Sequence, residues 1–249
     1  MRPAPPRRAS YSGSPRSDLS VAGDFKLDTA VPWGRNRAEY TAFFDLAGVP
    51  PHRRILDCAG GPSSFTVEAS RLGHLVVAAD PLYGLSKDDI KARIEESREA
   101  IAAGLRSAGH RFVWDAYGTP ENLEATRFSA MKHFLEDYEE GLAEGRYLEA
   151  ALPDLPFEDE AFDLALSSHF LFLYSAQFDL DFHLASVLEL CRVAPEVRIF
   201  PLLDMEGERS RHLPPVIDHL QGRGLATEIR KVDYEFQKGG NEMLLIRPV

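Results

Sequence analysis

Short apolar runs alternate with longer amphipathic stretches along most of this chain. The first run, 55–59, leads into two glycines, and an amphipathic stretch then leads to a second run, 75–79, which ends at Asp80. Apolar runs of about five residues between turn residues are typical of buried strands, whereas an apolar residue at every third or fourth position is typical of helices. The region from Arg54 to Tyr83 is therefore predicted to form a strand, a turn, a helix and a second strand, which is a βαβ unit.

The same alternation continues to the C-terminus. The last two predicted strands flank the glycine turn Lys238–Asn241, which favours an antiparallel hairpin. We therefore predict an α/β fold with a mostly parallel sheet and one antiparallel edge. The further strands are expected at 147–152, 162–167, 197–203, 227–232 and 243–246, and helices at 36–46, 179–193 and 216–220.

A helical pair is predicted between the second and third strands, in the region 84–145. Ser86 with Asp89 begins the first helix, and Thr119-Pro120 begins the second. A crossover between parallel strands needs only one helix, so the pair is an added element. It could cap an active site, form a homodimer surface or enlarge the core.

The N-terminal residues differ in composition from the rest of the chain. Residues 1–20 are rich in Pro, Arg, Ser and Gly, and cannot bury enough apolar surface to fold, so we expect a disordered arm. Residues 21–249 are expected to form a single domain with an N-terminal helix and the helical insertion.

The turn after the first predicted strand has the residues of a ligand site. Gly60 and Gly61 allow a backbone to pass close to a ligand, because a Cβ would collide with it. The helix that follows directs free N–H groups into the same crevice. Asp57 and Asp80 lie near the ends of the two strands, so the unit suits a nucleotide-like ligand.

Five features of the chain, in the same order, resemble the class I S-adenosylmethionine-dependent methyltransferases. They are the stretch 55–63 (ILDCAGGPS), Asp80, the stretch 155–164 (LPFEDEAFDL), the helix end 189–193 (ELCRV) and the C-terminal hairpin. The resemblance covers about residues 35–249. It implies a Rossmann-like seven-stranded sheet, S-adenosylmethionine as cofactor and methyl transfer as the reaction.

The resemblance also implies roles for individual residues at the first two strands. Asp57 would hold the positively charged methionine end of the cofactor, and Ala59, Gly60 and Gly61 would shape the turn that approaches it. Asp80 would accept hydrogen bonds from the two ribose hydroxyls, with Pro81 beside it.

Further cofactor contacts are implied around the third and fourth strands. Ala151 and Leu152 would border the adenine, and Ser168 would also contact the cofactor. Two positions depart from the family pattern, because Ser63 replaces the last glycine and Ala151 replaces an acid, for which Asp154 or Glu149 could substitute.

Arg35 is a candidate from its own position, in an irregular segment that leads into a helix just before the first strand. A guanidinium there could bind a ligand carboxylate, and we assign it to the cofactor site; the alternative is a surface salt bridge.

His169 is the candidate general base. It follows the fourth strand, whose carboxyl end faces the transferred methyl group in the resembling family, and imidazole titrates near neutral pH. The alternatives are that His169 orients a loop or binds substrate, with Tyr174 as a lesser candidate. The expected acceptor is a small or medium organic molecule that is methylated on oxygen, nitrogen or carbon.

Other types of site are disfavoured. Asp179, Asp181 and His183 alternate at the start of a helix, which indicates a helix cap rather than a metal site, and we expect no metal. A nicotinamide dehydrogenase would require Gly-x-Gly-x-x-Gly, but Ala59 and Ser64 occupy the outer positions.

Charge and cysteine content further restrict the function. The net charge is −11, and residues after the first seventeen carry −15, which disfavours a nucleic-acid substrate. Two separate cysteines and no long apolar run suggest a cytoplasmic protein with no membrane span. Two alternatives remain open: an RNA methyltransferase aided by the basic arm, and a cofactor-binding interaction module without catalysis.

Overall fold

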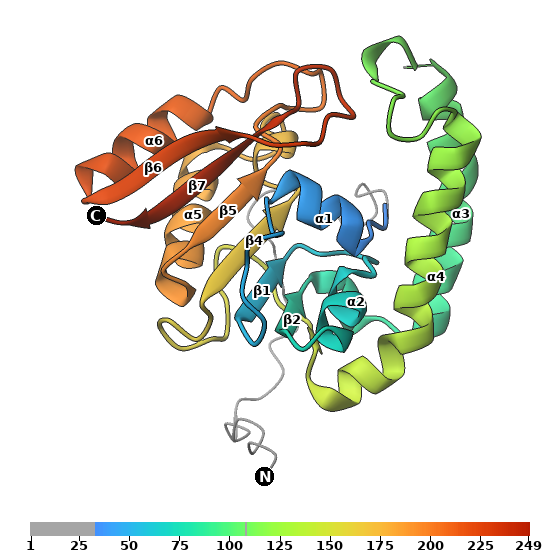
Figure 1. The fold of residues 1–249 in the computed structure, drawn as a ribbon, viewed down its shortest axis with the longest axis horizontal. Coiled ribbons are helices and arrows are strands. Elements are labelled where there is room, and N and C mark those ends of the chain that lie inside the picture. Colours follow the sequence, from blue (N-terminus) through green and yellow to red (C-terminus); the bar gives the residue numbers. More distant parts are fainter. Residues whose placement is uncertain (1–32, 108) are drawn as a thin grey trace.

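The computed structural model describes residues 33–107 and 109–249, and the predicted arm, 1–20, lies outside these ranges. Its centre is a seven-stranded sheet with the order β3-β2-β1-β4-β5-β7-β6 (Figure 1). The first five strands run parallel and β7 is antiparallel to both of its neighbours, so the predicted fold class is confirmed. The strands are β1 (Arg54–Cys58), β2 (Leu75–Ala79), β3 (Tyr147–Leu148), β4 (Leu164–Ser168), β5 (Val197–Phe200), β6 (Leu225–Lys231) and β7 (Glu242–Pro248).

The strand order reverses between β1 and β4. The chain moves from β1 outward through β2 to β3, and then returns to the other side of β1 to form β4. Asp57 of β1 lies between Ala78 of β2 and Leu166 of β4 in the register. In sheets of this kind, ligands bind in the crevice at the carboxyl ends of the strands where the order reverses.

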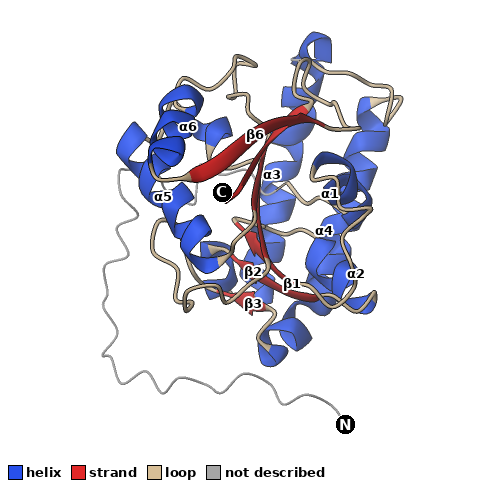
Figure 2. Cartoon of the chain, turned by 60° about the vertical axis from the view of Figure 1, so that its left-hand side comes forward, coloured by secondary structure: helices blue, strands red, loops and turns tan. Residues whose placement is uncertain are grey.

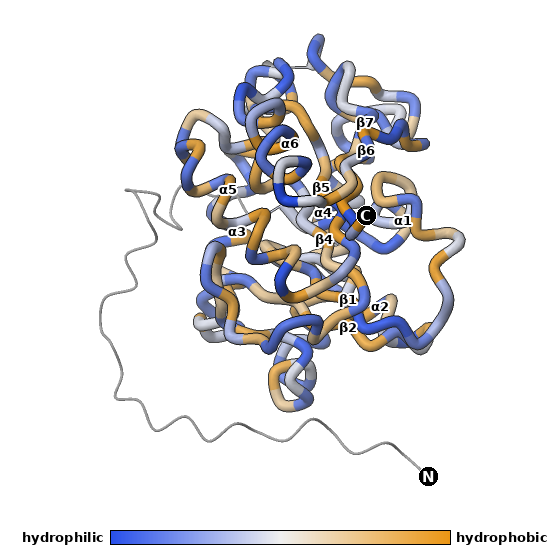
Figure 3. The backbone as a smooth tube through the Cα atoms, turned by 90° about the vertical axis from the view of Figure 1, so that its left-hand side faces the viewer, coloured by the Kyte–Doolittle hydropathy of each residue, from blue (hydrophilic) through white to orange (hydrophobic). Residues whose placement is uncertain are grey.

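Helices cover both faces of the twisted sheet, as Figure 2 shows. On one face, apolar residues of the strands pack against α5 (Leu180–Val193) and α6 (Leu213–Gly222). On the other face they pack against α1 (Arg37–Phe43) and α2 (Phe65–Arg71), through an aromatic cluster. Hydrophobic residues gather on the strands in the middle of the molecule (Figure 3), which is why both faces need a cover.

The predicted helical pair is present as two long helices, α3 (Lys87–Ser107) and α4 (Pro120–Glu144), beside the β2–β3 end of the sheet (Figure 1). Thr119 caps α4 by accepting a hydrogen bond from the Asn122 N–H, and Gly145 ends it in the left-handed conformation. α4 packs against α2 and β3, and α3 packs along α4. The pair therefore extends the core beyond the sheet edge.

Within residues 33–107 and 109–249, three short 3₁₀ segments complete the helical elements. They are η2 (Pro81–Gly84), η3 (Gly109–Arg111) and η4 (Phe172–Tyr174). None of the helices within the described ranges is long and apolar enough to cross a bilayer.

The largest differences from the predicted strands are at the ends of β3 and β5 and in the hairpin loop. β3 ends at Leu148 rather than Leu152, because the chain turns there and the Asp154 N–H donates to the Ala151 carbonyl at 3.2 Å. β5 ends at Phe200, immediately before the cis proline Pro201, which lacks the N–H that would continue the ladder. The antiparallel hairpin is confirmed, but its strands are joined by a ten-residue loop, 232–241.

Phe134 tests whether α4 belongs to the cooperative core. It has no exposed surface, and its ring lies 5.2 Å from the rings of Tyr138 and Tyr147. We expect Phe134→Ala to lower the free energy of unfolding by about 3–5 kcal/mol in urea denaturation, because it leaves a cavity. Leu142→Ala, at a 38% exposed position of the same helix, is the control and should cost less than about 1 kcal/mol. Equal small losses would mean that α4 unfolds apart from the sheet.

Candidate functional site

Asp57 is a carboxylate buried at the end of β1. It has no exposed surface, and the Tyr40 hydroxyl of α1 donates to its two oxygens at 3.0 and 3.1 Å. Burial raises the pKa of Asp57 to about 7, with the Tyr40 hydrogen bond opposing the shift and the charge of Asp80 adding to it. Asp57 has no cationic partner among the described residues.

The glycine turn follows Asp57 directly. Ala59 has a φ of +59°, in the left-handed region that glycine prefers, so this alanine keeps the backbone shape of a glycine. A Cβ at Gly60 would lie 2.6 Å from an Asp57 carboxylate oxygen, which excludes any larger residue. A Cβ at Gly61 would meet nothing within 4 Å, so the backbone of Gly61 borders open space.

Asp80 lies across this turn, after β2. One of its oxygens accepts the Leu82 N–H at 2.8 Å and the other accepts the Gly61 N–H at 2.9 Å. Burial raises the pKa of Asp80, and the two backbone N–H groups oppose that shift. Pro81 is the first residue of η2, so Asp80 also acts as its cap. The structure thus brings together Asp57, Gly60, Gly61 and Asp80 as the sequence predicted.

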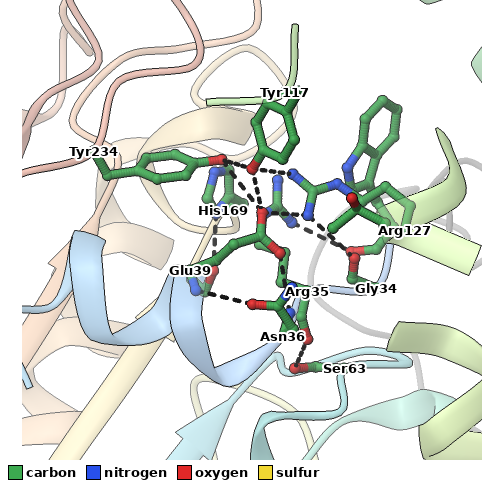
Figure 4. Close-up of polar contacts among 12 residues, drawn as sticks. Gly34, Arg35, Asn36, Glu39, Ser63, Tyr117, Arg127, His169 and Tyr234 are labelled. Atoms are coloured by element: carbon green, nitrogen blue, oxygen red, sulfur yellow. Dashed lines mark hydrogen bonds and ion pairs between the residues drawn. The ribbon is translucent and has the colours of Figure 1, made fainter. Parts of the chain in front are cut away.

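A second group of polar side chains gathers beside the end of β4, and Figure 4 shows them pointing toward one another. They come from the segment before α1, from α1 itself, from the loop before α4, from α4, from the end of β4 and from the β6–β7 loop. We call them the arginine cluster: Arg35, Glu39, Tyr117, Arg127, His169 and Tyr234.

Glu39 and Arg127 form a buried ion pair in this cluster. Arg127 has no exposed surface and Glu39 is 6% exposed. The same Glu39 oxygen accepts the Tyr117 hydroxyl at 2.5 Å, and its other oxygen accepts the Asn36 N–H at 3.0 Å as part of a capping box. Burial alone would raise the pKa of Glu39, but Arg127, Arg35 and the Tyr117 hydroxyl together outweigh it, so the pKa lies below its ordinary value.

Arg35 is tied to the glycine turn through its backbone. Its carbonyl accepts the Ser63 hydroxyl at 2.7 Å and the Ser64 N–H at 3.0 Å. Its side chain points toward Arg127, where burial and the charge of Arg127 lower its pKa. Gly34 allows this segment to pass between α4 and the turn, because a Cβ there would lie 2.6 Å from the Pro62 carbonyl oxygen.

His169 directs its ring into the arginine cluster. Its backbone has a φ of +53°, and its N–H donates to the Phe200 carbonyl at 2.6 Å. The ring packs edge-on against Phe43 and Phe200, and Nδ1 lies 2.8 Å from the hydroxyl of the buried Ser168. Burial, followed by the charges of Arg35 and Arg127, lowers the pKa of His169 well below 6.5, so the ring is neutral at physiological pH.

The remaining predicted residues lie at the start of the β3–β4 connection. Leu152 is buried and Ala151 is partly exposed, in the turn that follows β3. Asp154 and Glu149, the two acids considered as substitutes at this position, are both exposed. Asp179 caps α5 by accepting the Phe182 N–H at 2.9 Å, as expected of a helix cap.

Sequence reasoning missed Tyr117, Arg127 and Tyr234. Arg127 left one signal, because it falls four residues after Leu123 and four before Met131 on the buried face of α4. A charge on an apolar face needs a partner, and Glu39 supplies it. Tyr117 and Tyr234 lie in loops, where periodicity gives no signal.

The raised pKa of Asp57 should make the free energy of unfolding fall as the pH rises. Its pKa is 3.8 in the unfolded chain and about 7 in the fold, so the folded state holds the proton more tightly and loses stability as pH rises between these values. Asp57→Asn removes this loss. Its free energy of unfolding should exceed that of wild type by up to about 4 kcal/mol at pH 8, and the two values should be equal near pH 4.

Urea denaturation at both pH values measures this difference. Asp181→Asn, at an exposed acid of α5, is the matched control and should follow wild type at both values. A difference between Asp57→Asn and wild type that does not change with pH would contradict the account.

The neutral state of His169 can be observed directly. In NMR spectra of histidine-labelled protein, the ring resonance of His169 is the one that is absent from His169→Gln. Its chemical shift should not change between pH 5.5 and 8, because burial and two guanidinium groups suppress protonation of the ring. An inflection near pH 6.5 would mean that the ring is accessible and not under their influence.

Comparison with protein-family models finds no match. Among solved structures, the chain resembles magnesium protoporphyrin IX methyltransferase from Synechocystis PCC 6803 with bound S-adenosylmethionine, at 10% identity and a TM-score of 0.43 over 83% of this chain and 74% of that one. It also resembles a SAM-dependent methyltransferase from Aquifex aeolicus, at 14% identity and a TM-score of 0.40 over 82% and 85%. A third is a putative S-adenosyl-L-methionine-dependent methyltransferase from Methanococcus maripaludis, at 10% identity and a TM-score of 0.44 over 80% and 79%. Because these TM-scores lie below 0.5, the fold rests instead on the strand order of the chain itself.

One curated protein is much more similar in sequence. The uncharacterized protein MJ0045 of Methanocaldococcus jannaschii is 34% identical over 222 residues, which cover 89% of this chain and 97% of that protein. The match extends over nearly the whole of both chains. The chain therefore belongs to the same family as MJ0045.

Proposed function

We propose that this protein is an S-adenosylmethionine-dependent methyltransferase that acts on a small or medium organic acceptor. The observation that carries the proposal is the convergence of Asp57, the Gly60–Gly61 turn and Asp80 at the reversal of strand order, with His169 at the end of the adjacent strand. Such a crevice is where α/β sheets of this kind bind nucleotides.

The residues of the turn fit this cofactor. Each Asp80 oxygen accepts one backbone N–H and retains capacity for another donor, which suits the two hydroxyls of a ribose. Asp57 is a buried carboxylate without a cation among the described residues, and a positively charged ligand beside it would stabilise its ionised form. Gly61 borders the open space that such a ligand requires.

Other predicted contacts remain part of the proposal. Ala151 and Leu152 would border the adenine, with Pro81 beside the ribose. Ser168, which lies next to His169 at the end of β4, would contact the cofactor.

The bound cofactor would supply an electrophilic methyl group on a sulfonium. The chain would then need to align an acceptor, exclude water and, for a protonated acceptor atom, receive a proton. His169 can receive it at Nε2 in the tautomer that donates from Nδ1 to the Ser168 hydroxyl. Two nearby guanidinium groups weaken this base, so an anionic acceptor would restore its basicity.

Calorimetric titration with S-adenosylhomocysteine tests the proposal. We expect wild type to bind it, and Asp80→Asn to bind it about 10- to 100-fold more weakly, because hydrogen bonds to a charged acceptor are lost. Asp181→Asn, at an exposed acid outside the site, is the control and should bind like wild type. Absence of binding by wild type, or equal binding by Asp80→Asn, would overturn the assignment of this crevice as the cofactor site.

A further inference from the structure

The arginine cluster contains more positive than negative charge. Its two guanidinium groups, those of Arg35 and Arg127, face the single carboxylate of Glu39. Glu39 is already engaged by Arg127, by Tyr117 and by the Asn36 backbone. Arg35 forms no ion pair with any residue that the structure describes, and its side chain donates one long hydrogen bond, to the Trp33 carbonyl at 3.3 Å.

Three buried N–H groups in or beside this cluster have no hydrogen-bond partner among the residues that the structure describes. They are Arg35 Nε, Arg127 Nε and Trp33 Nε1. An unsatisfied buried polar group costs about 1–3 kcal/mol, and such groups are rare in folded proteins. All three are donors, so a group that satisfies them must be an acceptor of hydrogen bonds.

The two halves of the site carry opposite charge. Asp57 and Asp80 lie at the ends of β1 and β2, and the charge of Asp80 helps to raise the pKa of Asp57. Arg35 and Arg127 lie beside His169 at the end of β4, and their charges help to lower the pKa of its ring. The negative half suits a cation, and the positive half suits an anion next to the position of the acceptor.

We infer that Arg35, supported by Arg127, binds a carboxylate of the methyl acceptor, and that the acceptor is therefore a carboxylic acid. The inference rests on the proposed function. A guanidinium fork can donate two parallel hydrogen bonds to a carboxylate. One carboxylate also matches the single excess positive charge of the cluster, whereas a phosphate dianion exceeds it.

The cofactor's own methionine carboxylate is the other source of such an anion, and the sequence alone assigned Arg35 to it. The two sources differ in one measurable respect. A residue that binds the cofactor's carboxylate changes the affinity for S-adenosylhomocysteine, whereas a residue that binds the acceptor leaves it unchanged.

The test compares wild type, Arg35→Gln and Arg37→Gln by calorimetry. Arg37 is the matched control, since it is an arginine two residues away at the start of α1, outside the arginine cluster. We expect all three to bind S-adenosylhomocysteine within threefold of one another. When saturated with it, wild type and Arg37→Gln should bind benzoate at least tenfold more tightly than Arg35→Gln does. Benzamide, which has the same ring without the charge, should bind wild type at least tenfold more weakly than benzoate.

Each other outcome decides between the sources. A tenfold loss of S-adenosylhomocysteine affinity in Arg35→Gln would assign Arg35 to the cofactor and overturn the inference. Benzoate binding that is absent, or equal in all three proteins, would also overturn it. If wild type binds no S-adenosylhomocysteine, the proposed function fails, and the benzoate comparison on the free protein still decides whether Arg35 is an anion site. Arg35→Lys, which keeps the charge, should regain part of the benzoate affinity, and its melting temperature should match that of Arg35→Gln.

Discussion

The buried ion pair between Glu39 and Arg127 holds the site together. It joins α1 to the inserted helix α4 across 88 residues of sequence, and Tyr117 and Tyr234 attach to it from two separate loops. Removing one partner of such a pair leaves an uncompensated buried charge, which costs about 3–5 kcal/mol. Arg127 also donates to the Gly34 carbonyl at 3.4 Å, so loss of this side chain would remove a contact to the segment that carries Arg35.

The charges of the site are poorly compensated in the free protein. Asp57 is buried with no cationic partner among the residues that the structure describes, and Arg35 lies beside another guanidinium. Ala59 and His169 both adopt the left-handed backbone conformation. The two uncompensated charges are unfavourable for folding and become favourable when ligands of the complementary charge are bound, whereas the left-handed backbone of Ala59 and His169 is a strain that the surrounding structure maintains. The uncompensated charge of Asp57 lies in the negative half of the crevice, and that of Arg35 lies in the positive half.

The sequence predicted the sheet, its antiparallel edge and the residues of the glycine turn, because these follow from local patterns: apolar runs, glycines and acids at fixed spacing. It did not predict the arginine cluster, whose members come from six separate segments and meet only in the folded chain. The end of β3 was also predicted wrongly. The chain turns after Leu148, and apolar residues such as Ala151 and Leu152 within the turn are equally typical of a strand. Motifs made of neighbouring residues can be predicted from the sequence. The positions of loop residues depend on tertiary packing and cannot.

A crystal structure of the protein with S-adenosylhomocysteine would show whether this crevice binds the cofactor. We expect both ribose hydroxyls within hydrogen-bond distance of Asp80, the sulfur facing the end of β4, and no contact between the ligand and the guanidinium of Arg35. Adenosine bound elsewhere, or a ribose without contact to Asp80, would contradict the assignment of this crevice as a cofactor site.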